Sequence, residues 1–144
     1  MSQDFALILS CVTLALLTTV VGARLFVERI REMRERRIPP QSVSTSRQVA
    51  ERLQAVQAAD NFRNLFEIPV LFYALCAVLV AANLVSASYV IGAWMFVFLR
   101  VVHSYIHCTY NRVTHRFAAF ALSSLILVAM WTALGVQLLY ARAT

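Results

Sequence analysis

The chain has 144 residues, 60% of them hydrophobic, and its mean hydropathy is +0.70. Soluble domains are about 45–50% apolar, so this composition indicates an integral membrane protein. Apolar stretches and their short connections take up residues 1–144, and we therefore expect one transmembrane domain. The net charge of +6 comes from arginines that, apart from Arg142, lie within the expected spans or on one side of them. This pattern follows the positive-inside rule and excludes nucleic acid as a partner.

A first membrane span is predicted over residues 5–27. Residues 5–23 carry no charge, and about 20 apolar residues suffice to cross the hydrocarbon layer. The segment before them has no basic residue, so we expect no cleavable signal peptide.

The stretch after this span is rich in charge and is predicted to form the cytoplasmic loop at about residues 28–48. Between Arg24 and Arg37 opposite charges recur at spacings of three and four, which predicts that the helix continues out of the membrane as an ion-paired extension. Pro39 and Pro40 end that extension. Thr45 and Gln48 have the spacing of a capping box, which predicts the start of the next helix.

The second and third spans share one long uncharged stretch. Residues 68–99 are 32 uncharged residues, which is more than one span needs. Two spans with a turn need roughly 44, so both spans must extend into the charged residues on either side. Turn-forming residues lie only at 83–88, so we predict spans over 60–83 and 88–109. Six polar or ionisable residues then lie inside the hydrocarbon layer: Arg63, Asn64, Glu67, Arg100, His103 and His107.

The fourth span is predicted over residues 117–140, which carry no charge. The connection before it, residues 110–116, is basic, as is the stretch 24–52. The positive-inside rule places both basic regions in the cytoplasm and both termini outside it. The predicted fold class is therefore all-α, an integral membrane four-helix bundle.

The intramembrane polar residues follow helical spacing. On the second span they form a stripe that begins at Asp60 and ends at Glu67, and on the third span a stripe that runs from Arg100 through His103 to His107. Both stripes lie at one depth near the cytoplasmic side, so antiparallel neighbours are expected to bring them face to face. Pro69 removes a backbone N–H that would bond to Leu65, which predicts a kink beside the polar site.

Two interpretations of these charges are open. In the first they are structural, with Glu67 neutralising Arg63 or Arg100. In the second they form a functional site, as intramembrane ionisable groups usually do. Because arginines outnumber acidic groups at this depth, the second interpretation calls for an anionic ligand, ideally one with carboxylates that match the guanidinium fork.

A metal site is a weaker interpretation. His103 and His107 are spaced one helical turn apart, as some zinc and haem ligands are. No third histidine or cysteine lies at a suitable spacing, and neighbouring arginines disfavour a cation, so we predict no metal. Cys11, Cys76 and Cys108 lie in apolar runs without metal or redox spacing, and we interpret them as small buried hydrophobic residues.

Two motifs resemble those of the MAPEG proteins, the membrane-associated proteins in eicosanoid and glutathione metabolism. The first is Arg-Asn-x-x-Glu at residues 63–67, followed by Pro69. The second is Arg-x-x-His at residues 100–103, with Arg112 and Arg116 downstream. The resemblance covers nearly the whole chain and is strongest to bacterial members that resemble microsomal glutathione transferases.

The resemblance implies a homotrimer in the bacterial inner membrane, with periplasmic termini and with glutathione bound between subunits near the cytoplasmic face. Arg116, with help from Arg112, is the implied catalytic group that stabilises the glutathione thiolate. A lipophilic substrate is implied to enter from the membrane lipid. The implied glutathione-binding residues are Arg24, Arg63, Asn64, Glu67, Arg100, His103 and His107.

The chain departs from the family pattern at three positions. His107 stands where the family commonly has tyrosine, Phe117 where some members have serine, and Asp60 where arginine is frequent. The resemblance favours an enzyme, a glutathione-dependent transferase or peroxidase acting on lipophilic electrophiles or hydroperoxides. The alternative is a non-enzymatic trimeric membrane protein whose buried polar residues serve assembly or bind another anionic ligand.

Overall fold

The computed structural model describes residues 2–54 and 56–143, with the side chains of 141–143, and so of Arg142, outside that description. The described residues form helices and no strand. Helix α1 (Gln3–Glu35) is followed by a short 3-10 helix, η1 (Pro40–Val43), and by α2 (Ser46–Arg52). The remaining helices are α3 (Gln57–Asn64), α4 (Ile68–Ala81), α5 (Ala87–Cys108) and α6 (Val113–Ala143).

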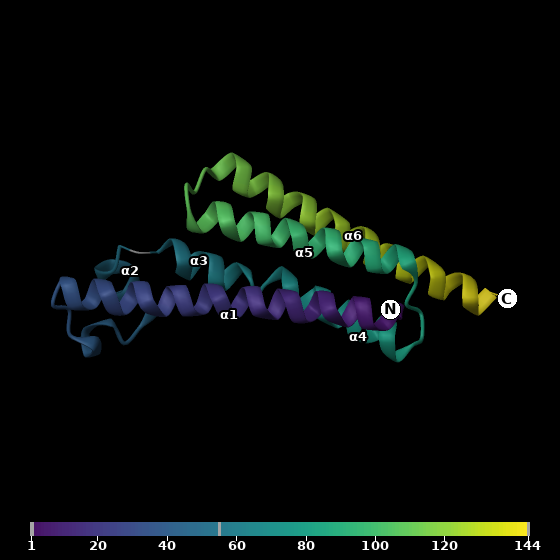
Figure 1. Ribbon diagram of the computed structural model, residues 1–144, viewed down its shortest axis with the longest axis horizontal. Coiled ribbons are helices and arrows are strands. Elements are labelled where there is room, and N and C mark those ends of the chain that lie inside the picture. Colours follow the sequence, from purple (N-terminus) through teal and green to yellow (C-terminus); the bar gives the residue numbers. More distant parts are fainter. Residues whose placement is uncertain (1, 55, 144) are drawn as a thin grey trace.

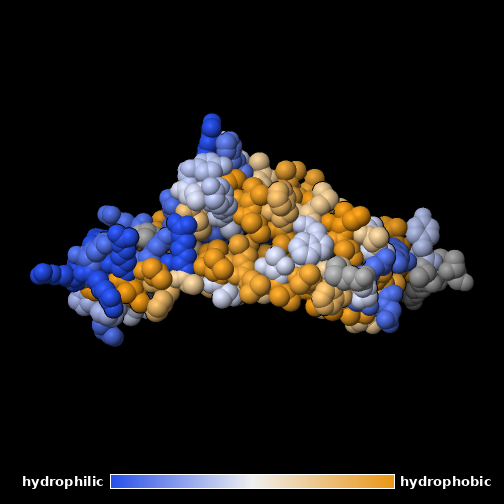
Figure 2. Space-filling model, viewed as in Figure 1, coloured by the Kyte–Doolittle hydropathy of each residue, from blue (hydrophilic) through white to orange (hydrophobic). Residues whose placement is uncertain are grey.

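Four segments are long and apolar enough to cross a membrane, which confirms the predicted all-helical membrane fold. They are Gln3–Glu35, Gln57–Ala81, Ala87–Cys108 and Val113–Tyr140. The two termini lie at one end of the bundle, and α2 and the α5–α6 turn lie toward the other (Figure 1). On the face that Figure 2 shows, an apolar belt crosses the middle of the bundle, and hydrophilic surface covers the end that carries α2.

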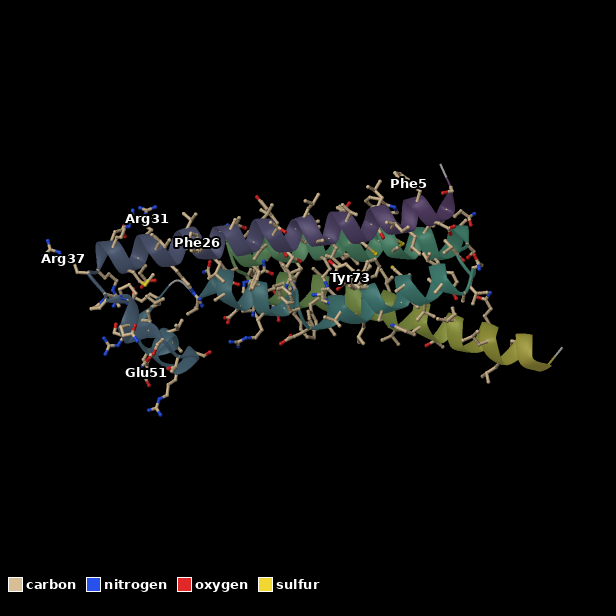
Figure 3. All side chains as sticks on the ribbon, turned by 90° about the horizontal axis from the view of Figure 1, so that it is seen from below. Phe5, Phe26, Arg31, Arg37, Glu51 and Tyr73 are labelled. Carbon is tan, nitrogen blue, oxygen red and sulfur yellow. The ribbon has the colours of Figure 1, made fainter. Side chains whose placement is uncertain are left out.

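Helix α1 extends past the apolar belt, as the charge spacing predicts. Arg31 pairs with Glu35 at 2.8 Å, and Arg36 pairs with Glu32 at 2.6 Å, each one turn apart. Figure 3 shows Arg31 at this end of the bundle, far from Phe5 at the other. The predicted capping box of Thr45 and Gln48 is present at the start of α2.

The second transmembrane segment is broken beside the polar residues, which confirms the predicted kink. Helix α3 ends at Asn64, and α4 begins at Ile68 with Pro69 in its first turn. Proline has no N–H to continue the hydrogen-bond ladder, so it is tolerated at a helix start but not within a helix. Glu67 lies in the break, with φ −93° and ψ −89°.

The core is apolar and lies toward the end of the bundle that carries the termini. The rings of Phe72 and Phe96 stack between α4 and α5 with centroids 4.6 Å apart. Leu7 and Leu14 of α1 and Leu134 of α6 are buried in the same cluster. This packing holds α5 within the bundle and therefore fixes the direction of its polar residues.

Candidate functional site

The polar stripe on α5 points into the bundle. Arg100 is 0% exposed, His103 2% and His107 1%. Helical spacing puts these three side chains on one face, and that face also carries the buried Phe96. A guanidinium and two imidazoles are thus held inside a single chain at the depth of a membrane span.

The polar stripe on the second segment is not buried with these three side chains. Asp60, Arg63 and Glu67 are exposed, and Asn64 is half-buried. The prediction that the two stripes face each other within one chain is wrong. A helix's stripe has a fixed spacing, but packing decides the direction in which it points, and here Asn61 faces α5 instead.

Asn61 is a site residue that the sequence analysis missed. It is 0% exposed, and its Nδ2 donates to Sγ of Cys108 at 3.3 Å. Its Oδ1 accepts from Oγ of Ser104 at 3.2 Å. A buried amide needs partners of this kind, and this one fixes α3 against the cytoplasmic half of α5.

Arg100 lies between two aromatic rings. Its Cζ is 5.4 Å from the centroid of Phe96 and 5.0 Å from that of Phe120. Cation–π attraction offsets part of the desolvation of the charge, and Glu67 acts on Arg100 electrostatically. None of its three guanidinium nitrogens has a hydrogen-bond partner among the described residues. A buried charge without a paired partner is unfavourable, so this guanidinium is suited to bind an anionic group.

The histidines meet the start of α6 through Arg116. Nδ1 of His103 lies 3.1 Å from the carbonyl oxygen of Arg116. Nη1 of Arg116 donates to Nε2 of His107 at 3.1 Å and to Oδ1 of Asn111 at 2.9 Å. A carbonyl only accepts and a guanidinium only donates. The proton of neutral His103 is therefore on Nδ1, and Nε2 of His107 carries a lone pair.

The short turn between α5 and α6 makes these contacts possible. Asn111 has a φ of 45°, and its N–H bonds to the carbonyl of Ile106 at 2.8 Å, which closes the end of α5. Asparagine tolerates this left-handed conformation better than most residues. Asn111 is not among the predicted site residues, although an asparagine just past a helix end is a known signal for a left-handed cap.

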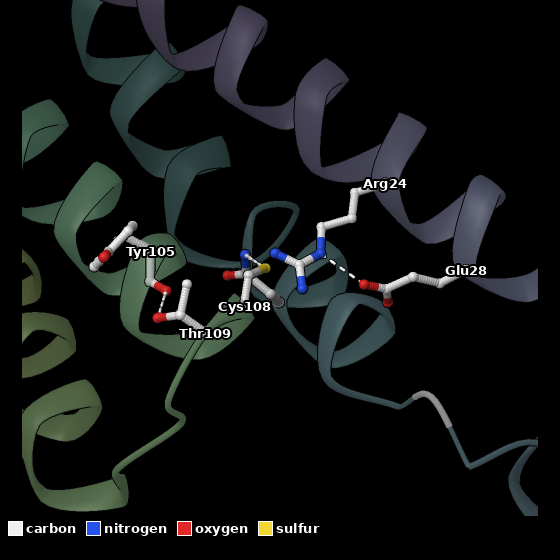
Figure 4. Close-up of polar contacts among 6 residues, drawn as sticks. Arg24, Glu28, Tyr105, Cys108 and Thr109 are labelled. Atoms are coloured by element: carbon white, nitrogen blue, oxygen red, sulfur yellow. Dashed lines mark hydrogen bonds and ion pairs between the residues drawn. The ribbon is translucent and has the colours of Figure 1, made fainter.

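Arg24 lies apart from this cluster. It pairs with Glu28 at 2.6 Å, and it lines a cavity of about 250 Å³ between α1 and α5 with Tyr105, Cys108 and Thr109. Figure 4 shows its guanidinium between Glu28 and Cys108.

Arg63 and Arg112 also lie outside the buried cluster. Arg63 lines a second cavity, of about 290 Å³, with Arg29, Ser44 and Asp60. The side chain of Arg112 is exposed. The fold of a single chain thus brings together Arg100, His103, His107 and Arg116. The other predicted site residues lie outside this buried cluster.

The two histidines that the weaker metal interpretation used do not belong to a cluster of metal ligands among the described residues. Within residues 2–54 and 56–143, no three His, Cys, Asp or Glu side chains come together as potential ligands. The rings of His103 and His107 are 5.7 Å apart between centroids, and one nitrogen of each is occupied by Arg116.

Comparison with known proteins gave a family match. The model of the MAPEG family matches residues 7–136. A search of the curated proteins found no match, and a search of the solved structures found none. The match covers all four candidate membrane spans in whole or in large part.

Proposed function

This chain belongs to the MAPEG family, and from that premise we propose that it is a glutathione-dependent membrane transferase or peroxidase. The family includes glutathione transferases and peroxidases as well as proteins of eicosanoid synthesis. The proposed acceptors are lipophilic electrophiles or hydroperoxides, because the site lies at the depth of the hydrocarbon layer.

The observation that carries this proposal is the surplus of buried positive charge. Arg100 is 0% exposed and has no hydrogen-bonded anion among the described residues, and Arg116 lies in contact with His107 nearby. Glutathione has two carboxylates, an ammonium and a thiol. Arginines match its carboxylates, and Glu67 and Asn64 supply acceptors for its ammonium.

The exposed stripe on the second segment supports assembly around the ligand. Arg63 and Glu67 are exposed on a single chain, and contact with lipid makes a charged side chain unfavourable by roughly 2.5–3.5 kcal/mol. We propose that a homotrimer covers them, with glutathione bound between subunits and in contact with Arg24, Arg63, Asn64, Glu67, Arg100 and His103.

Arg116 is the proposed catalytic residue, and exposed Arg112 adds positive charge at the same helix start. Bound glutathione supplies a thiolate that attacks the acceptor. With a chlorinated nitroaromatic the sulfur bonds to carbon and chloride leaves; with a hydroperoxide the sulfur takes the outer oxygen, the alcohol leaves after proton uptake, and a second glutathione converts the sulfenic acid to a disulfide and water. Arg116 stabilises the negative charge on that sulfur, which lowers the pKa of the glutathione thiol. No cysteine of the chain is required in this scheme.

The proposed location is the bacterial inner membrane, with periplasmic termini and cytoplasmic basic loops. The support is the charge distribution: α2 and the α5–α6 turn share the end opposite the termini (Figure 1), and that end carries most of the arginines. The glutathione site then opens toward the cytoplasm.

Calorimetric titration of the purified protein with glutathione tests the proposal. We expect binding in the wild type, strong weakening in Arg100→Ala, and no change in Arg47→Ala, which removes an exposed arginine paired only with Glu51. Absence of binding at millimolar glutathione, or binding unaffected by Arg100→Ala, would contradict it.

A non-enzymatic trimer is the second candidate. The observation that favours it is the complete burial of Arg100 behind Phe96 and Phe120, as expected of a charge that serves packing. Conjugation of glutathione to a chlorinated nitroaromatic substrate separates the two functions, since turnover excludes the non-enzymatic candidate.

A further inference from the structure

One nitrogen of Arg116 is fully engaged by its own chain. Nη1 carries two N–H bonds; one meets Nε2 of His107 at 3.1 Å, and the other meets Oδ1 of Asn111 at 2.9 Å. These acceptors come from the last turn of α5 and from the α5–α6 connection. Two acceptors on one nitrogen restrict both the position and the rotation of the guanidinium plane.

The backbone of Arg116 is held as well. His103 donates from Nδ1 to its carbonyl oxygen at 3.1 Å, and its own N–H bonds to the carbonyl of Arg112 at 3.0 Å. Among the described side chains, none binds Nε or Nη2 of Arg116. The hydrogen-bonding capacity of these two nitrogens is therefore not used by the described side chains.

We propose that His107 and Asn111 are positioning residues that hold Arg116 by Nη1 and present its Nε–Nη2 edge to the thiolate of glutathione. This proposal rests on the function proposed above. It gives His107 a role different from direct ligand binding, since its Nε2 is occupied and its Nδ1 is buried. It also brings Asn111 into the site.

The arrangement works only while His107 is neutral. Nε2 accepts from Arg116, so the ring proton is on Nδ1; an imidazolium has two donors and no acceptor, and it repels the guanidinium. Three charged or titratable groups act on His107: Arg116 on α6 bonds to it, the ring of His103 on α5 lies 5.7 Å from its ring, and the exposed Asp60 on α3 acts on it electrostatically. Protonation of His107 at acidic pH therefore releases Arg116.

Turnover at varied pH tests this role in the wild type, His107→Gln and His107→Leu. Glutamine places a non-titrating acceptor near the position of Nε2, whereas leucine provides none. We expect His107→Leu to lower kcat by about 10- to 100-fold, the loss typical of a slightly misplaced catalytic group, with little change in KM for glutathione. We expect His107→Gln to retain kcat. After correction for ionisation of the glutathione thiol, the wild-type kcat should still fall at acidic pH, and this fall should be absent in His107→Gln.

His115→Gln is the matched control, because His115 is exposed and contacts only Tyr110 among the described side chains. Its pH profile should equal that of the wild type. If His107→Leu kept the wild-type kcat and pH profile, the positioning role would be overturned while glutathione binding and turnover still stood.

Asn111→Gly tests the second acceptor. Glycine keeps the left-handed conformation without strain and removes Oδ1. We expect a lower kcat and a higher pKa of the bound glutathione thiol, measured by thiolate absorbance. Asn83→Gly is the matched control, since Asn83 has a φ of 56° in the distant α4–α5 turn. Equal thiol pKa values in the two variants would contradict the role of Asn111.

A further measurement needs no glutathione. Nitrogen NMR of labelled histidine reports the tautomer of His107, with its signal assigned by loss in His107→Gln. We expect a neutral ring protonated at Nδ1 in the wild type and relaxation of that preference in Arg116→Leu. A proton on Nε2 in the wild type would overturn the arrangement even if glutathione binds. The expected tautomer in a protein that binds no glutathione would preserve the arrangement and reject the proposed function.

Discussion

The side-chain amide of Asn61 on α3 donates from Nδ2 to Sγ of Cys108 at the end of α5, at a distance of 3.3 Å. The two residues are 47 positions apart in the chain, and both are buried. Oγ of Ser104 donates to the same amide at 3.2 Å. These contacts join α3 of the second segment to the end of α5, next to the buried His103 and His107.

Asn61→Leu should therefore destabilise the protein by about 1–3 kcal/mol, because it leaves buried polar groups without their partner. The double variant Asn61→Leu/Ser104→Ala should recover part of that loss, since it removes a group left unpaired. Thermal unfolding in detergent measures both. Strict additivity of the two single effects would show that the pair does not interact.

Arg100→Leu should increase stability in the absence of glutathione. The guanidinium is buried between Phe96 and Phe120 and has no hydrogen-bonded partner in the part of the chain that the structure describes. Replacement of buried ionic groups by apolar ones often stabilises by about 1–4 kcal/mol. With saturating glutathione the order should reverse, because only the wild type gains stability from binding. Melting temperatures with and without glutathione report this crossover; a variant less stable in both conditions would indicate a structural role for Arg100.

Gly22 should tolerate no side chain. A Cβ at this position would lie 2.9 Å from Cε2 of Phe62, whereas one at Gly135 would meet nothing within 4 Å. Gly22→Ala should push α3 away from α1 and destabilise by about 1–3 kcal/mol. Gly135→Ala should be neutral or stabilising by about 0.5–1 kcal/mol. Thermal unfolding compares the two, and equal effects would contradict the close packing of α1 and α3.

Pro69→Ala should restore helical hydrogen bonding across residues 65–69 and weaken glutathione binding. Proline in a helix interior is unfavourable by about 3 kcal/mol relative to alanine, so its removal favours a continuous helix in which Glu67 changes direction. Hydrogen exchange should show greater amide protection across the present break, with Pro40→Ala as the control in η1. Unchanged protection would show that the turn at Leu65–Glu67 persists without the proline.

Much of the fold follows from the sequence because membrane thickness is a fixed length. The count of uncharged residues between Glu67 and Arg100 sufficed to predict two spans, a turn near Asn83 and charges within the hydrocarbon layer. Helix α5 begins four residues after that asparagine, and Arg100 is indeed buried. Pro69 predicted the helix break because the loss of its N–H acts locally.

The tertiary structure alone decided which side chains meet. Helical spacing groups Asp60, Arg63 and Glu67 on one face. The direction of that face depends on how Phe62 and Asn61 of the same segment pack against α1 and α5, which no local pattern specifies. The contact of Arg116 with His107 and Asn111 likewise requires the tight α5–α6 turn. The sequence by itself determined how many helices cross the membrane and how deep their charges lie, because length and hydropathy act on each segment separately. The rotation of each helix, and so the partner of each charge, depends on contacts between segments.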